Sequence, residues 1–180
     1  IIKLHPMNEI FIKANKIQFI GVLISIPIVL FFIFILWLRW DTVFYQSLKE
    51  IKVFLLCFKS KKLNAFLAFL VPNLIIMIGI IIHELIHGAF MAFFSKNNWK
   101  SVKFGIVKKH FMPYANCIEP LKSIQMLIVA LAPFIILGLI PSLYGILYGN
   151  LFFLFIGFSM TLGAVGDFIY TYLIFKVGLN

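Results

Sequence analysis

Four long apolar segments determine what this 180-residue chain can fold into. They cover residues 17–38, 63–94, 124–148 and 151–175. Each is long enough to cross a bilayer as a helix, which takes about 20 residues. Hydrophobic residues make up 63% of the chain and charged residues only 12%, and a soluble domain of this length would lack the polar surface to cover them. The sequence therefore predicts an all-α integral membrane protein, a single domain over residues 1–180 with four transmembrane helices.

The stretch over residues 42–60 has the spacing of a helix but too many charges for a membrane span. Its apolar face is formed by Phe44, Leu48, Ile51, Leu55 and Phe58, and the other positions include Gln46, Lys49, Glu50, Lys52 and Lys59. A helix with this pattern lies in the membrane interface, with its apolar face towards the acyl chains. The sequence therefore predicts one amphipathic interfacial helix between the first two spans.

The most polar connection, over residues 95–122, joins the second and third apolar segments. Within it, residues 101–107 alternate polar and apolar side chains with a period of two, which is typical of a half-buried strand. Residues 111–118 are suited to return as a partner strand, and Pro120 closes the connection. We therefore predict a short β-hairpin or strand pair between the second and third spans.

The net charge of +10 raises the question of a nucleic-acid partner. The lysines, however, cluster in the connections between apolar segments. Basic residues in such places interact with anionic lipid headgroups. The expected partner of these charges is the lipid bilayer, and no nucleic acid is expected.

Four spans place the amino terminus, the 95–122 connection and the carboxyl terminus on one side of the membrane. That side holds ten basic residues and the other side holds six, so the positive-inside rule favours the first side as cytoplasmic. Cys57 and Cys117 fall on opposite sides, and no disulfide is expected between them. We predict an integral membrane protein with both termini in the cytoplasm.

Three ionisable side chains interrupt the second apolar segment, in the order His83-Glu84-Leu85-Ile86-His87. Positions four apart on a helix share a face, so His83 and His87 can bind one metal ion, and Glu84 is placed to act on a metal-bound water. An ionisable group at the centre of a membrane helix costs about 3 kcal/mol, which makes purely structural pairing with a neighbouring helix the weaker explanation. The pattern predicts one Zn²⁺ ion on the two histidines, with Glu84 as the catalytic residue.

Catalytic zinc takes three protein ligands and a water, so this pair needs a third ligand. Asp167 is the single acid of the fourth apolar segment, and its depth from the helix end, roughly 13 Å, is close to that of the histidine motif, roughly 12 Å. Glu119 is the alternative, but it lies in a polar connection before Pro120, where an exposed carboxylate needs no partner. We favour Asp167. His5 and His110 are expected to be ordinary loop histidines.

These features, in this order, resemble the site-2 protease-like intramembrane metalloproteases, and more closely the small bacterial zincin peptidases grouped as DUF3267. The likeness covers about residues 63–175 and is carried by His83-Glu84-Leu85-Ile86-His87, Ile118-Glu119-Pro120-Leu121, Leu131-Ala132-Pro133 and Gly166-Asp167. It implies a bacterial cell-membrane enzyme, with zinc on the two histidines and the aspartate, that acts on membrane-embedded or membrane-associated peptides. Ser159 stands where site-2 proteases have asparagine, and Phe168 where they have glycine, so the resemblance does not extend to the mode of substrate binding.

We therefore expect a zinc metalloprotease that hydrolyses peptide bonds inside the membrane. Glu84 is expected to move a proton from the zinc-bound water to the leaving amine. Water is expected to enter from the cytoplasmic 95–122 side, where a strand within residues 95–107 would hold an unwound substrate by edge pairing. The alternatives are a non-catalytic accessory or immunity-type protein that retains the fold, and a small transporter. Glu84 argues against the first, because metal binding alone does not require it.

Overall fold

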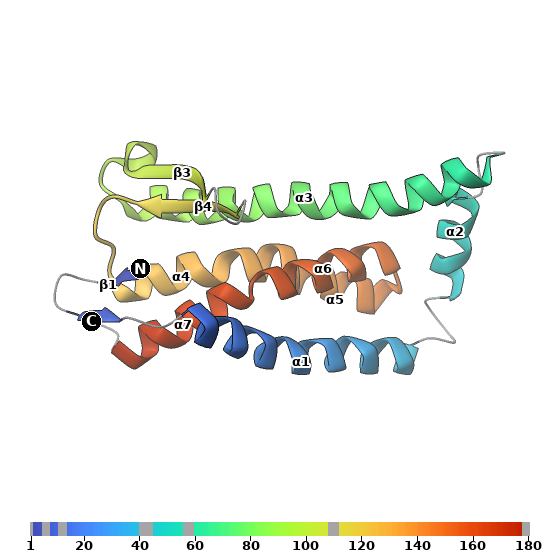
Figure 1. Cartoon of the computed structure of the whole chain (residues 1–180), viewed down its shortest axis with the longest axis horizontal. Coiled ribbons are helices and arrows are strands. Elements are labelled where there is room, and N and C mark those ends of the chain that lie inside the picture. Colours follow the sequence, from blue (N-terminus) through green and yellow to red (C-terminus); the bar gives the residue numbers. More distant parts are fainter. Residues whose placement is uncertain are drawn as a thin grey trace.

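The structure is a computed structural model, and it describes residues 2–4, 8–10, 14–39, 45–55, 60–107 and 112–177. Most of these residues are helical. Figure 1 shows the long helices running along the longest axis of the molecule, with the β-strands at one end and α2 at the other. The mainly helical architecture predicted from the apolar segments is confirmed.

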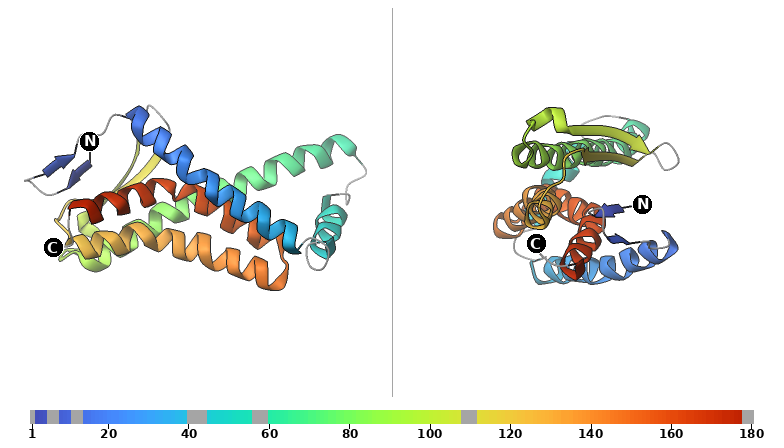
Figure 2. Two further views of the ribbon diagram at one scale, coloured as in Figure 1. Left: turned by 90° about the horizontal axis from the view of Figure 1, so that it is seen from below. Right: turned by 90° about the vertical axis from the view of Figure 1, so that its left-hand side faces the viewer.

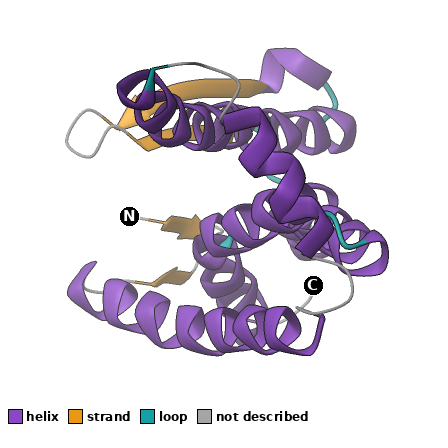
Figure 3. Ribbon diagram, turned by 90° about the vertical axis from the view of Figure 1, so that its right-hand side faces the viewer, coloured by secondary structure: helices purple, strands orange, loops and turns teal. Residues whose placement is uncertain are grey.

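The first predicted span is helix α1 (Ala14–Arg39), and the described part of the predicted interfacial helix is α2 (Tyr45–Leu55). Residues 42–44 and 56–59 of that prediction lie outside the described residues. Figure 3 looks onto this end of the molecule, where α2 lies across the ends of the long helices. The backbone N–H of Leu151 donates a hydrogen bond of 3.1 Å to the Ser47 hydroxyl and ties α2 to the turn before α6. The interfacial location of α2 stays a prediction.

Helix α3 (Lys61–Phe94) is the longest helix and carries the histidine motif in its second half. At its amino end, the side chain of Ser60 accepts a hydrogen bond from the backbone N–H of Leu63. At its carboxyl end, the N–H of Ser95 donates to the carbonyl of Met91 at 3.0 Å. Pro72 lies inside the helix without ending it. The second apolar segment is therefore one continuous helix.

Within the part of the chain that the structure describes, three helices are long and apolar enough to cross a membrane, and a fourth span is counted if one bent pair is included. The three are α1, α3 and the run Ser123–Tyr148, which consists of α4 (Ser123–Pro133), the π-helical segment η3 (Phe134–Leu139) and α5 (Ile140–Tyr148). The bent pair is α6 (Leu151–Gly163) and α7 (Val165–Val177), which meet at 46°. The fourth apolar segment is thus a broken helix rather than the single helix expected.

The helices form layers, which Figure 2 shows from two further directions. Helix α3 packs on one side against the β3–β4 strands and on the other against α4 and α6, while α7 lies between α4 and α1. Helices α5 and α6 lie very close together because small residues face each other between them. A side-chain carbon added to Gly145 would lie 2.6 Å from the backbone nitrogen of Leu154, so a larger residue there would force the two helices apart.

The predicted hairpin between the second and third spans is present. Strands β3 (Val102–Val107) and β4 (Met112–Cys117) pair antiparallel, and a short 3₁₀ helix, η2 (Asn98–Ser101), leads from α3 into β3. The aromatic ring of Phe104 packs so closely on Gly88 of α3 that a side-chain carbon at Gly88 would collide with it. The hairpin therefore lies directly on the helix that carries the histidine motif.

A second antiparallel pair, β1 (Ile2–Leu4) and β2 (Asn8–Ile10), was not predicted from the sequence. Each strand has three residues, which is too short for a period of two to show in the sequence. Cys117 has a free thiol, and Cys57 lies outside the described residues.

Candidate metal centre

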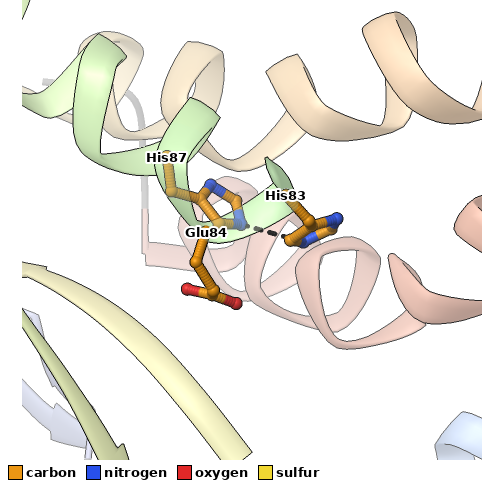
Figure 4. A group of neighbouring side chains, drawn as sticks. All are labelled: His83, Glu84 and His87. Carbon is orange, nitrogen blue, oxygen red and sulfur yellow. Dashed lines mark hydrogen bonds between the residues drawn. The ribbon is translucent and has the colours of Figure 1, made fainter. Parts of the chain in front are cut away.

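His83 and His87 lie one turn apart on α3, and their side chains meet. The two Nε2 atoms are 3.2 Å apart, and Figure 4 shows both rings on one side of the helix. The His83 side chain is 12% exposed and the His87 side chain 11% exposed, so water has little access to either ring. The i to i+4 spacing thus produces the shared face expected of it.

Asp167 reaches the two histidines from α7. Its Oδ2 is 3.0 Å from Nε2 of His83, and its Oδ1 is 3.3 Å from Nε2 of His87. Two segments about eighty residues apart in the chain therefore deliver three potential ligands to one point. The matching depths inferred from the sequence agree with this meeting.

The break between α6 and α7 gives Asp167 its position. The backbone N–H of Asp167 donates to the carbonyl of Ala164 at 3.0 Å, so the aspartate lies in the first turn of a new helix. A carboxylate is stabilised there by the helix dipole. Ala164 is fully buried at the bend. The sequence signal for this break was the pair of glycines at 163 and 166, since glycine weakens a helix by about 1 kcal/mol relative to alanine.

The proton on His87 can be assigned from its neighbour. Its Nδ1 is 2.9 Å from the backbone carbonyl of Val129 on α4. A carbonyl only accepts hydrogen bonds, so Nδ1 is the donor and carries the hydrogen. In the neutral ring Nε2 then has a free lone pair, directed at His83 and Asp167. Histidines that bind metals use this arrangement, in which a carbonyl hydrogen-bonded to the other ring nitrogen fixes the tautomer.

The three groups fit a zinc ion. Zinc bonds of about 2.0–2.1 Å in a tetrahedral site place neighbouring ligand atoms about 3.3 Å apart. Here the two histidine nitrogens are 3.2 Å apart, and each lies within 3.3 Å of one oxygen of the Asp167 carboxylate, Oδ2 for His83 and Oδ1 for His87. In addition, Oδ2 of Asp167 is buried and has no hydrogen-bond partner among the described residues, although it faces His83. A cation between these atoms would satisfy the orphaned oxygen and both nitrogens together.

Glu84 extends from the same turn of α3 in a different direction. Its carboxylate and the two histidine ring nitrogens lie within 4.8 Å of one another. Figure 4 shows the carboxylate directed towards the side on which the strands run. The backbone of Ala115 on β4 lies within hydrogen-bonding reach of it. Glu84 is therefore close enough to the two histidines to bind the same metal ion, and its role as catalytic base rather than ligand stays a prediction.

Glu119, the alternative third ligand, is engaged elsewhere. Its carboxylate accepts hydrogen bonds from the backbone N–H groups of Lys96, at 2.8 Å, and Asn97, at 3.3 Å, and from the Ser101 hydroxyl at 2.7 Å. These bonds hold the pKa of Glu119 below its usual value of 4.5, and the bond from Ser101 makes the largest contribution. His5 and His110 lie outside the described residues.

The lowered pKa of Glu119 predicts an acid-induced opening of the loop at 96–101. The carboxylate stabilises this loop fully above about pH 4.5, and the stabilisation is lost as the pH falls through the lower pKa of the folded state. Fluorescence of Trp99 would report it after Trp37 and Trp40 are replaced by phenylalanine. We expect a transition below pH 4.5 that Glu119→Gln removes; the same transition in the glutamine variant would contradict this assignment.

A family model described as DUF3267, putative zincin peptidase, matches residues 74–180. The matched range includes the histidine motif, the β3–β4 hairpin and Asp167. Comparison with curated proteins and with solved structures gave no match to this chain.

Proposed function

Since the chain belongs to the family described as DUF3267, putative zincin peptidase, we propose that it is an intramembrane zinc metalloprotease. The observation that carries the proposal is the convergence of the His83 and His87 nitrogens with the Asp167 carboxylate, between helices of membrane-spanning length and composition. A peptide bond cleaved at this centre lies at the depth of those helices. The substrates proposed are therefore membrane-embedded or membrane-associated peptides.

In this proposal His83, His87 and Asp167 hold one Zn²⁺ ion and Glu84 is the general base. Zinc bound there supplies a Lewis acid and an activated water at neutral pH. Glu84 accepts a proton at a carboxylate oxygen and passes it to the amine that leaves. The Val129 carbonyl keeps the His87 ring oriented through Nδ1, so that Nε2 stays directed at the ion.

The apolar cavities between α3 and α6 support an apolar substrate. A cavity of about 250 Å³ is lined by Ile82, the neighbour of His83, and by Ser159 and Met160 of α6. Ile75 and Phe155 line both this cavity and a larger one of about 640 Å³ that extends towards α1 and α2. The lining of both is almost entirely apolar, which suits the side chains of a membrane segment rather than a polar peptide.

The β3–β4 hairpin is proposed to hold the substrate backbone. A two-stranded sheet leaves one edge of each strand available for pairing with an extended peptide. The strand expected for this role lay within residues 95–107, but the backbone next to Glu84 is that of Ala115 on β4. We therefore favour β4 as the strand beside which the scissile bond lies. Water and substrate are proposed to enter from this end, which the lysine distribution assigns to the cytoplasm.

Metal content and metal-dependent cleavage test the proposed function. We expect purified protein to contain one zinc ion per chain and to cleave an apolar peptide of about 25 residues, with a central Ser-Gly pair, in phosphatidylcholine vesicles. Removing zinc with a chelator should abolish cleavage, and adding zinc back should restore it, because the ion activates the water. Zinc content is measured by elemental mass spectrometry, and peptide cleavage is measured by separating the labelled fragments.

The same measurement separates the proposal from its main alternative. A non-catalytic accessory or immunity-type protein with this fold would bind zinc and leave the peptide intact, or would bind no metal. Protein that carries no metal under any condition would contradict both the zinc centre and the protease. The HExxH spacing of Glu84 favours the enzyme, because in the proposed site the two histidines and Asp167 bind the metal and leave Glu84 for proton transfer.

A further inference from the structure

The carboxylate of Glu119 gathers hydrogen bonds from one short segment. Besides the donors Lys96, Asn97 and Ser101 already described, the side-chain amide of Asn97 donates to it. Two backbone and two side-chain donors around one exposed carboxylate are more than solvation of a surface acid requires. Charge-assisted bonds of this kind are about twice as strong as neutral ones. The cluster therefore fixes the segment 96–101 to Glu119, two residues beyond the end of β4.

This cluster closes the base of the hairpin, meaning residues 101–102 and 117–118. The backbone N–H of Ile118 donates to the carbonyl of Ser101 at 2.8 Å, and Val102 pairs with Cys117 in the strand register. Glu119 is the next residue along the chain. Its bonds thus extend the strand pairing to the point where α3 ends, and they join the hairpin base to the end of that helix.

The position of the hairpin matters because β4 runs past Glu84. Phe104 and Ala115 are partners across the two strands. The Phe104 ring packs on Gly88 of α3, and the Ala115 backbone lies within hydrogen-bonding reach of Glu84. Both strands pack on α3, so a shift of the hairpin base along that helix would carry Ala115 away from Glu84. Among the described residues, the Glu119 bonds are the polar contacts that join this base to the end of α3.

We propose that Glu119 is a positioning residue that anchors the hairpin base to the end of α3 and so holds β4 beside Glu84. The anchor keeps the substrate-binding strand in register with the proton-transfer group without touching either the ion or the substrate. This role rests on the proposed function for its catalytic consequence, whereas the anchoring itself does not. The anchoring also gives Glu119 a structural role that is separate from metal binding.

The anchor is tested by replacing Glu119 with alanine. We expect amide hydrogen exchange in residues 112–117 to become at least about tenfold faster, because four hydrogen bonds to a charged group are lost. Cleavage of the vesicle-bound peptide should fall by a similar factor, while zinc content stays at the wild-type value. Lys100→Ala is the matched control, since its exposed side chain lies in the same loop and outside the cluster; it should change none of these values.

A disulfide at the hairpin base provides a rescue. Because the Ser101–Ile118 pair is hydrogen-bonded, the next pair, Val102 and Cys117, is of the non-hydrogen-bonded kind, with Cα atoms about 4.5 Å apart. This lies within the range that a disulfide spans. Val102→Cys in the Glu119→Ala protein, with Cys57→Ser to remove the other thiol, should therefore form a covalent substitute for the anchor. Burial raises the pKa of the Cys117 thiol, so the oxidation is done with diamide at mildly alkaline pH.

The oxidised triple variant is expected to regain slow exchange in 112–117 and peptide cleavage, and the reduced form of the same protein should regain neither. Three results would overturn the proposal. They are unchanged exchange in Glu119→Ala, loss of zinc in proportion to activity, and a formed disulfide that restores slow exchange but not cleavage. If the wild-type protein cleaves no peptide, the proposed function fails, and the exchange and rescue measurements still decide whether Glu119 anchors the hairpin.

Discussion

Replacing Glu84 with glutamine should abolish peptide cleavage and leave one zinc ion bound per chain. Glutamine keeps the size and shape of the side chain but cannot accept the proton of the attacking water at neutral pH. General-base catalysis contributes about 10²- to 10⁴-fold to a rate, so kcat is expected to fall by at least that factor. Zinc should remain because, in the proposed site, the two histidines and Asp167 bind the ion and Glu84 does not. Elemental analysis measures the zinc content and the vesicle peptide assay measures kcat, both on the same sample.

Leu85→Ala is the control for this experiment. Leu85 follows Glu84 on the same helix, and its side chain is largely exposed on the outer surface of α3. Its replacement should leave both zinc content and cleavage close to wild type. Retained cleavage in Glu84→Gln would remove Glu84 from the mechanism, and lost zinc would make it a ligand instead.

Asp167→Asn is expected to release the metal. The substitution replaces an anionic ligand with a neutral amide and leaves the buried site with two imidazoles. Loss of a group that only hydrogen-bonds to a metal ligand weakens metal binding by about 10- to 100-fold, so loss of a direct ligand should weaken it by more than about 100-fold. Zinc content after dialysis against a weak chelator measures the change, and cleavage should be lost with the metal.

Thr171→Val provides the matched control on α7. Thr171 is one turn beyond Asp167, and its hydroxyl is buried without a hydrogen-bond partner among the described residues. Valine has the same shape, so this protein should bind zinc as the wild type does. Full zinc content in Asp167→Asn would show that another residue completes the site. Glu119→Ala, tested for the hairpin, also shows whether Glu119 is that residue.

The positions of the long helices along the chain and the meeting of His83, His87 and Asp167 were accessible from the sequence because both follow from length and spacing. Apolar segments of membrane length become helices, and the four-residue spacing of His83 and His87 places both on one face. The depth argument brought Asp167 to them because an intramembrane acid needs a partner. These inferences use properties of single segments and distances along a helix axis.

Features that depend on contacts between segments were not accessible. In the sequence alone Glu119 looks like an ordinary acidic loop residue. Its hydrogen-bond donors at 96–101 are brought to it only by the pairing of β3 with β4. The break at Ala164 also depends on tertiary packing, since isolated glycines within an apolar run are tolerated in membrane helices. The carbonyl that orients His87 comes from α4, and any residue type could have supplied it.

The break at Ala164 determines how a bound metal ion would contribute to the stability of the fold. Because α7 begins anew there, its first turn presents Asp167 to α3 with little support from the axis of α6. In the proposed zinc-bound protein, the ion is a cross-link between the second apolar segment and the end of the fourth. A ligand that binds only the folded chain stabilises it by mass action, and each tenfold excess of free ligand over Kd adds about 1.4 kcal/mol. The supply of zinc in the cell would then set how much of this protein persists in the membrane as well as how fast it works.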